Sequence, residues 1–262
     1  MDYEFIKYEK RGKIAYITLN RPERLNALHL PAHRELSAAW DDFDADENAW
    51  VAIVSGAGDR AFCAGNDLKY VTEHPEDIGR DELMPRGGFG GIVTRYDLYK
   101  PVIAAVHGFA LGGGLEVALA SDLIIASEDA RFGLPEPRVG DIANAGGINR
   151  LSRQIPLKQA MAIILTGRRM DAREAMRMGI VNEVVPREKL LETADAWAND
   201  ILEASPLAVR ASKETAMAGL DVSLPVSMRM KFPNVQALFS SEDAIEGPNA
   251  FAEKRKPVWK GR

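Results

Sequence analysis

The chain has 262 residues, 46% of them hydrophobic, which is enough for one large folded domain or one domain with a small appendage. Its net charge of −5 gives nucleic-acid binding no electrostatic support, and its single cysteine, Cys63, excludes an intrachain disulfide. The acidic N-terminus has no apolar signal region, and no apolar run approaches the ~18 residues of a membrane span, so we expect a cytoplasmic protein.

The first half of the chain alternates strand and helix patterns. Residues 5–8 and 14–19 alternate apolar and polar side chains around an Arg-Gly turn, which predicts a β-hairpin. Residues 30–44 begin with Leu-Pro and carry apolar side chains at helical spacing, which predicts a helix. Short buried strands are predicted at residues 51–55, 102–106 and 123–126. Repeated strand–strand–helix units predict an α/β domain whose sheet faces are covered.

The stretch from Tyr70 to Tyr99 is the least regular part of the chain. It contains several prolines and the segment Gly87-Gly-Phe-Gly-Gly91. Such a stretch is typical either of a surface loop or of a mobile lid over a ligand pocket, and the residues alone leave both open.

The chain becomes helical in pattern from about residue 188 to its end. Helices are predicted over residues 190–204 and 207–218. We therefore divide the chain into a core domain, residues 1–187, and a C-terminal helical domain, residues 188–262. The apolar positions of the second domain would pack on the core or on a neighbouring subunit.

Two turns offer exposed backbone N–H groups to a ligand. The first, Gly112-Gly-Gly-Leu-Glu116, follows a predicted strand and opens a predicted helix. Glycines let the backbone approach a ligand closely, and a helix N-terminus favours negative charge on an oxygen. Taken alone, this turn could also serve only to pack a helix on a strand. The second turn, Phe62-Cys-Ala-Gly-Asn-Asp-Leu68, makes a shared binding function the better interpretation.

Two glutamates stand twenty residues apart beside these turns. Glu116 lies in an otherwise apolar helical pattern, which argues against a plain surface role. Glu136 lies between Pro135 and Pro137, which restrict its backbone. Two carboxylates beside paired N–H donors predict an acid/base site that can polarise a carbonyl group.

These segments, in this order, resemble the enoyl-CoA hydratase/isomerase (crotonase) superfamily over nearly the whole chain. The resemblance implies a fold of repeated ββα units with a C-terminal helical oligomerisation region. It implies that the N–H groups of Ala64 and Gly113 form the oxyanion hole. Hydratases of the superfamily have glutamate at both positions matching Glu116 and Glu136. By that resemblance Glu116 helps water attack C3 of a 2-enoyl thioester and Glu136 protonates C2, a syn addition that also runs in reverse.

The resemblance further implies how coenzyme A is held as part of the substrate. Arg24 would reach a phosphate, and Phe251 and Lys254 would reach the coenzyme A bound to a neighbouring subunit. The full set of implied substrate contacts is Arg24, Leu25, Ala27, Gly65, Asn66, Asp67, Leu68, Gly112, Asn144, Phe251 and Lys254. A homotrimer or a dimer of trimers is therefore expected, with no separate cofactor.

We expect no metal site. His29 and His33 are four residues apart, as two ligands on one helix face would be, but the sequence suggests no third ligand nearby. No histidine or aspartate is placed to activate Cys63 as a nucleophile.

Three segments resemble carnitinyl-CoA dehydratases within the superfamily: residues 87–91, 166–170 and 241–262. The family's usual Pro and Gly or Asp after the second glutamate are replaced here by Ala143 and Asn144, beside the expected acyl pocket. We therefore expect a short uncharged enoyl-CoA first and a substrate with a trimethylammonium group second. For the latter, Phe89, Tyr96 and Phe109 are candidate aromatic faces and Asp141 a candidate charge.

Two other functions stay open. The same site could move a double bond, with one glutamate carrying a proton between C2 and C4. A non-enzymatic RNA-binding or scaffold role is also known in the superfamily, but the net charge and the glutamate pair argue against it.

Overall fold

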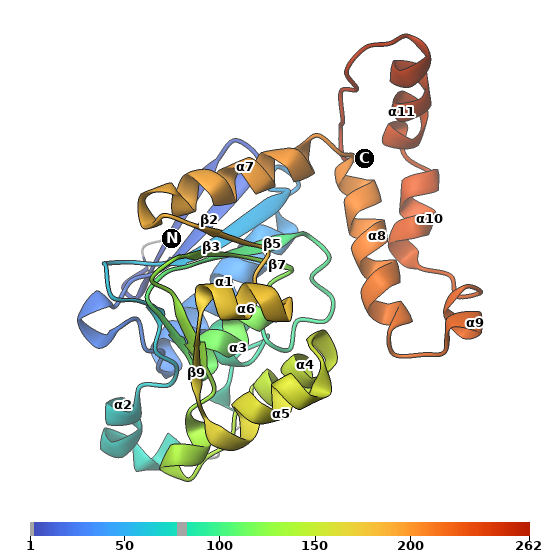
Figure 1. Cartoon of the computed structure of the whole chain (residues 1–262). Coiled ribbons are helices and arrows are strands. Elements are labelled where there is room, and N and C mark those ends of the chain that lie inside the picture. The colour runs from blue at the N-terminus through green and yellow to red at the C-terminus, as the bar shows by residue number, and fades with distance from the viewer. Residues whose placement is uncertain (1–2, 78–82) are drawn as a thin grey trace.

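The computed structural model describes residues 3–77 and 83–262 (Figure 1). Its larger sheet has six strands in the order β1-β2-β3-β5-β7-β10. The strands are β1 (Ile6–Arg11), β2 (Ile14–Leu19), β3 (Val51–Gly56), β5 (Val102–Val106), β7 (Leu123–Ser127) and β10 (Glu183–Val185). The pair β1–β2 is the predicted hairpin, and all other neighbours in this sheet are parallel.

A second sheet has four strands of three residues each, in the order β4-β6-β8-β9. They are β4 (Ala61–Cys63), β6 (Phe109–Leu111), β8 (Arg131–Gly133) and β9 (Arg169–Asp171). The chain passes from the first sheet to the second three times, from β3 to β4, from β5 to β6 and from β7 to β8. This repetition confirms the predicted α/β class and its strand–strand–helix units.

Helices cover both sheets. They are α1 (Leu30–Ala45), α2 (Leu68–Glu73), α3 (Gly113–Ala120), α4 (Gly147–Gln154), α5 (Leu157–Thr166) and α6 (Ala172–Met178). Helix α1 buries Leu36, Trp40 and Phe43 because these side chains recur every three or four residues on one face. Helix α3 is buried nearly all round, so its glutamate is enclosed by the core.

Helix α7 (Leu190–Leu202) belongs to the core by its packing. Its buried Leu190, Ala194 and Ala198 lie in one cluster with Ile53 and Ile103 of the larger sheet. By packing, the boundary between the core and the C-terminal region therefore falls after α7, whereas the prediction placed it after residue 187. The reason is that helical spacing shows which face of a helix is apolar but does not identify what covers it.

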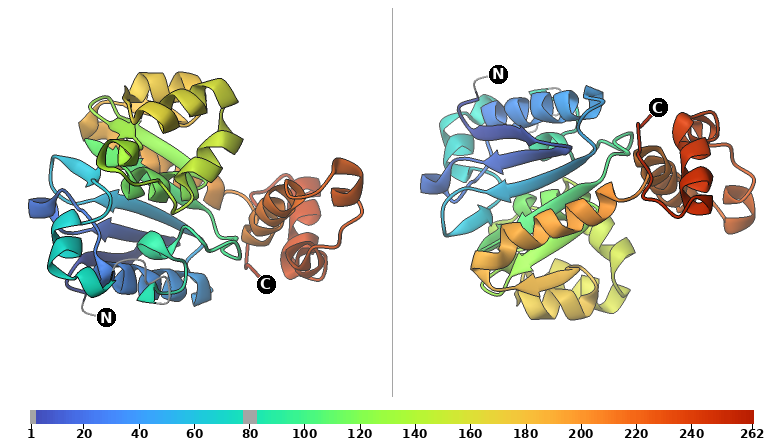
Figure 2. Two further views of the ribbon diagram at one scale, coloured as in Figure 1. Left: turned by 90° about the horizontal axis from the view of Figure 1, so that it is seen from below. Right: turned by 90° about the horizontal axis from the view of Figure 1, so that it is seen from above.

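The remaining helices form an arm that projects from the core (Figure 2). They are α8 (Pro206–Gly219), α9 (Leu224–Ser227), α10 (Pro233–Phe239) and α11 (Glu242–Ala252). The C-terminal end returns to the base of the arm, where the indole N–H of Trp259 donates to the carbonyl of Glu203 at 2.8 Å. No helix in the described part of the chain is long and apolar enough to cross a membrane.

Residues 86–95, from the predicted irregular stretch, form a packed wall on α1. Ser37 Oγ of α1 donates to the carbonyl of Arg86 at 2.8 Å. Arg95, 7% exposed, donates to the carbonyls of Gly91 and Ser37. A Cβ at Gly91 would come within 2.6 Å of the Ser37 nitrogen, so only glycine allows this approach. This part is therefore not the surface loop considered above, and residues 78–82 lie outside the described residues.

Candidate active site

The glycine turn between β6 and α3 is surrounded by other side chains. Gly112 has φ +55°, and a Cβ there would lie 2.6 Å from Oε1 of Glu136. A Cβ at Gly113 would lie 2.3 Å from Cζ of Phe89. The missing side chains therefore let a carboxylate and an aromatic ring approach the start of α3 directly.

The second predicted turn lies against the first. A Cβ at Gly65 would meet the backbone nitrogen of Gly113 at 3.1 Å, and one at Gly114 would meet the carbonyl oxygen of Cys63 at 2.0 Å. The thiol of Cys63 is fully buried, and burial raises its pKa to about 12. The structure thus brings residues 63–65 and 112–114 together, while it keeps the cysteine inert.

The two predicted oxyanion donors differ in their surroundings. Gly113 is the first residue of α3, where a backbone N–H has no acceptor within its own helix. The N–H of Ala64, in contrast, donates to the carbonyl of Leu25 at 3.0 Å. For Ala64 to serve a thioester oxygen, this hydrogen bond must be shared or broken when a substrate binds.

Glu116 is enclosed and oriented by a backbone N–H. Its side chain is 3% exposed, and the N–H of Gly147 donates to its Oε1 at 2.8 Å. Burial raises the pKa of Glu116 to about 7; the hydrogen bond from Gly147 acts to lower it and the charge of Glu136 to raise it. Part of the population is therefore protonated near neutral pH.

Glu136 contacts the same glycine turn at Gly112 through its side chain. It begins the 3-10 turn Glu136–Val139 after β8, and its Oε2 is buried without a hydrogen-bond partner among the described residues. Burial also raises the pKa of Glu136. Both carboxyl groups have a raised pKa, and the charge of Glu136 contributes to that of Glu116. Such a pair is suited to chemistry in which one group donates a proton and the other accepts one.

Sequence reasoning missed two residues around Glu116. The first is Gly147, which acts through its backbone. The second is Arg150, whose positive charge lowers the pKa of Glu116 and whose Nη2 donates to the carbonyl of Val93 at 2.5 Å. Arg150 thus connects the glutamate to the packed wall. The Gly146-Gly147 pair at the start of α4 was the sequence signal that could have drawn attention to this corner.

The substituted pair after Glu136 separates in the structure. Ala143 is 2% exposed. A Cβ added at Gly147 would meet both the Cβ of Ala143, at 3.1 Å, and the side chain of Glu116. Asn144 is exposed, as is Asp141, whose charge acts to raise the pKa of Glu136. Only Ala143 therefore borders the enclosed glutamate.

Of the three candidate aromatic faces, Phe89 contacts the glycine turn through its ring. Its ring packs on His33 with centroids 4.5 Å apart. The N–H of the adjacent Gly90 donates to Nδ1 of His33 at 3.0 Å, which fixes the position of the ring. Tyr96 is 76% exposed, and Phe109 lies at the start of β6 beneath the guanidinium of Arg169. The expectation that Phe109 would face the acyl group is therefore corrected, because its ring lies beneath Arg169. Tyr96 acts on the charge of Arg150, which in turn acts on Glu116, so Tyr96 stays a candidate face.

The predicted coenzyme A segments run side by side. The N–H of Leu28 donates to the carbonyl of Gly65, and that of Asp67 to the carbonyl of Leu28, both at 2.8 Å. The Asp67 carboxylate is already engaged: it pairs with Arg21 at 2.9 Å and accepts the N–H of Tyr70 at the start of α2. The ion pair between Asp67 and Arg21, a residue that the sequence did not single out, therefore holds residues 21–28 against residues 65–67. Of the other predicted contacts here, Arg24, Asn66 and Leu68 are exposed, Leu25 is half-buried and Ala27 is buried.

Phe251 and Lys254 lie on the arm, away from the glycine turn of their own chain (Figure 2). Phe251 is 88% exposed, and Lys254 follows α11. One chain therefore does not bring these two residues to its own site.

The two histidines considered as metal ligands, His29 and His33, have structural partners. His29 caps α1 by accepting the N–H of Ala32 at 3.4 Å. His33 contacts the packed wall. Over residues 3–77 and 83–262, no three His, Cys, Asp or Glu side chains gather as metal ligands would.

Comparisons with known proteins agree over the whole chain. A family model described as enoyl-CoA hydratase/isomerase matches residues 9–262. The carnitinyl-CoA dehydratase of Proteus mirabilis is 43% identical over 256 residues, covering 96% of this chain and 97% of the relative. That of Salmonella typhi is 41% identical, with 99% of both covered. The crystal structure of enoyl-CoA hydratase from Mycobacterium tuberculosis H37Rv superposes with a TM-score of 0.91 at 39% identity, covering 98% of this chain and 99% of that one.

Proposed function

Because the chain belongs to the enoyl-CoA hydratase/isomerase family, we propose that it is a hydro-lyase that adds water reversibly to a 2-enoyl-CoA. The observation that supports this best is a pair of carboxyl groups with raised pKa values: Glu116, which is buried in α3, and the half-buried Glu136, which contacts Gly112. The N–H of Gly113, assisted by that of Ala64, would hold the thioester oxygen and draw electrons away from C3.

Proton transfer then follows from the two environments. Glu116, held by the N–H of Gly147, would orient and deprotonate the water that attacks C3. Glu136, with its raised pKa and with Oε2 lacking a hydrogen-bond partner in the described part of the chain, would deliver a proton to C2. Isomerisation needs only one carboxyl group to carry a proton between C2 and C4, so the second enclosed glutamate favours hydration.

We further propose that the acyl group is that of carnitinyl-CoA and its dehydrated product crotonobetainyl-CoA. Relatives more than 40% identical over the full chain carry the name carnitinyl-CoA dehydratase. Phe89 supports the proposal because its ring lies at the glycine turn, where it could face a trimethylammonium group. Asp141, whose charge acts on Glu136, would add negative charge near that glutamate.

Replacing Phe89 by leucine should lower kcat/KM for crotonobetainyl-CoA by about 2- to 30-fold, the range of one cation–π contact. The value for crotonyl-CoA should change less, because that chain has no cationic group. The comparison needs initial rates with both substrates, and wild-type protein should prefer the betaine. Tyr96→Leu is the parallel variant, since Tyr96 is the exposed candidate aromatic face. Equal losses for the two substrates, or a wild-type preference for crotonyl-CoA, would leave a general short-chain hydratase as the function.

The arm supports a second proposal, assembly into a trimer or a dimer of trimers. Its helices and turns expose large apolar side chains, 72–88% exposed at Leu220, Leu224, Met228, Phe239 and Phe251. Isolated chains rarely leave such a group uncovered. Truncation before Ser240 should weaken coenzyme A binding and lower the mass measured by light scattering. A fully active full-length monomer would contradict both the assembly and the reach of Phe251 into a neighbouring site.

A further inference from the structure

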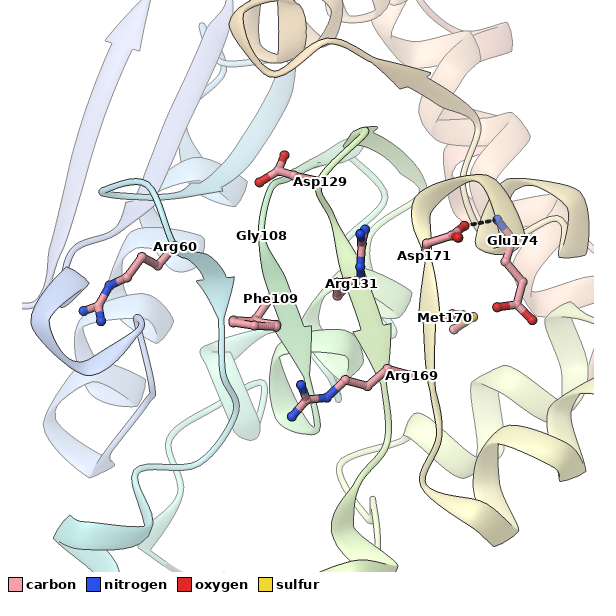
Figure 3. Close-up of a pocket in the computed structure, with 9 residues that line it drawn as sticks. All are labelled: Arg60, Gly108, Phe109, Asp129, Arg131, Arg169, Met170, Asp171 and Glu174. Carbon is pink, nitrogen blue, oxygen red and sulfur yellow. Dashed lines mark hydrogen bonds between the residues drawn. The ribbon is translucent and has the colours of Figure 1, made fainter.

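A cleft of about 650 Å³ lies on the outer face of the four-stranded sheet (Figure 3). This volume is within the range of small-molecule sites. The lining residues are Arg60, Gly108, Phe109, Asp129, Arg131, Arg169, Met170, Asp171 and Glu174. Most stand at the starts of β6 and β8 or along β9, with Arg60 before β4 and Glu174 on α6, whereas the candidate active site follows the ends of β6 and β8. The cleft is therefore distinct from the glycine turn.

The position of Arg169 is built by two neighbouring strands. Arg169 pairs in register with Gly133 of β8, and a Cβ at Gly133 would stand 3.4 Å from Cγ of Arg169. Because glycine leaves this space open, the arginine can cross β8 to Phe109, and its guanidinium carbon lies 5.3 Å from the centre of that ring (Figure 3). A guanidinium held by its face keeps the N–H groups along its edge available.

Two more arginines line the cleft without a carboxylate partner among the described residues. Arg131 donates through Nη1 only to backbone carbonyls, at 2.8 Å to that of Ala130. Arg60, at the rim, donates through Nη2 to the carbonyl of Pro22 at 3.0 Å. Each retains further N–H donors, which are suited to a bidentate oxyanion.

The three acidic residues of the lining already accept hydrogen bonds, two of them from arginines outside the cleft. Asp129 accepts from Arg187 at 2.8 Å and from the hydroxyl of Ser127. Asp171 accepts the backbone N–H of Glu174 at 2.7 Å. The Glu174 carboxylate accepts from Arg168 at 2.6 Å. The charges of Asp129 and Glu174 are thus partly balanced by arginines outside the cleft, whereas Arg131 and Arg169 have no carboxylate partner among the described residues.

We propose that this cleft binds a small diphosphate-bearing anion, with Arg169 and Arg131 as its principal ligands. Arginine forks match phosphate oxygens in pairs, and Phe109 holds one fork in place before the ligand arrives. This site is independent of the proposed hydration, so either can fail without the other.

Inorganic pyrophosphate is the probe, titrated into the full-length protein by calorimetry at low ionic strength in the presence of saturating coenzyme A. We expect binding that weakens at least about tenfold in Arg169→Gln and in Arg131→Gln, the effect of losing a charge-assisted hydrogen bond. Binding should also weaken as salt is added. Arg11→Gln is the matched control, because it removes the same charge from the exposed hairpin, where Arg11 pairs with Glu9.

Three outcomes would overturn the proposal. The first is the absence of pyrophosphate binding under these conditions. The second is binding that coenzyme A abolishes and that Arg169→Gln leaves unchanged, which would place the anion in the acyl-CoA groove. The third is a fall in assembly mass by light scattering in Arg169→Gln without any effect on the anion, which would assign the cleft to a contact between subunits. Retention of hydratase activity in both variants is expected.

Discussion

Glu116→Gln and Glu136→Gln are each expected to lower kcat by about two orders of magnitude or more, the usual contribution of a positioned acid or base. Glutamine keeps the size of the side chain and can still accept the N–H of Gly147, but it cannot exchange a proton. Affinity for coenzyme A should change little, because neither carboxyl group is among the predicted coenzyme A contacts. Loss of enoyl-thioester absorbance measures kcat, and the mass of the product distinguishes water addition from isomerisation.

Glu214→Gln is the matched control for these variants. Glu214 is also buried, 4% exposed, and its carboxylate also accepts a backbone N–H, from Asn234 at 2.8 Å. It lies on α8 in the arm, so its replacement should preserve kcat. Near wild-type hydration by Glu116→Gln or by Glu136→Gln would remove that residue from the chemistry.

The second large effect concerns stability. Glu116→Gln should raise the free energy of unfolding at pH 8 by up to about 3 kcal/mol. Burial raises the pKa of Glu116 from 4.5 to about 7, so the folded protein keeps a proton that the unfolded chain has released. Wild-type stability therefore falls as pH rises from about 4.5 to 7, and glutamine removes this penalty. Below pH 4.5 both states are protonated, and the variant should match the wild type.

Urea unfolding at pH 4 and pH 8, at one protein concentration, measures the difference. Glu192→Gln, an exposed glutamate on α7, is the control and should change stability little at either pH. A variant that is less stable than the wild type at pH 8 would show that the carboxylate stabilises the fold. The expected result is that the active site lowers the stability of the protein at working pH, as many catalytic sites do.

The hairpin and three further strands of the larger sheet, β3, β5 and β7, followed from the sequence because their side-chain patterns are local, whereas β10 was not predicted. Strands β4, β6, β8 and β9 have three residues each, too few for an alternating pattern, and their pairing depends on residues far apart in the chain. The outward position of Phe109 has the same cause. Alternation within Phe109–Leu111 shows that two side chains share a face, but it cannot show which face the core covers.

The sequence predicted the residues of the candidate site that act through their side chains better than those that act through their backbone. Glu116, Glu136 and the glycines stand in recognisable motifs. Gly147 contributes an N–H, Ala64 has its N–H engaged by Leu25, and Arg150 reaches Glu116 through the fold of α4. These relations depend on tertiary packing and leave little trace in residue type. Asp67 was predicted as a ligand contact, whereas its ion pair with Arg21 joins two segments.

The packed wall has a consequence for how such an enzyme can diverge. Phe89 is carried by residues 86–95, and these are fastened to α1 through His33, Ser37 and Trp40. The two glutamates belong to α3 and to the turn after β8. Under the proposed function, substrate preference and proton transfer would therefore reside on separate parts of the chain. Exchanging residues 86–95 together with the facing side of α1 could redirect the enzyme to a new acyl group while its chemistry is inherited unchanged.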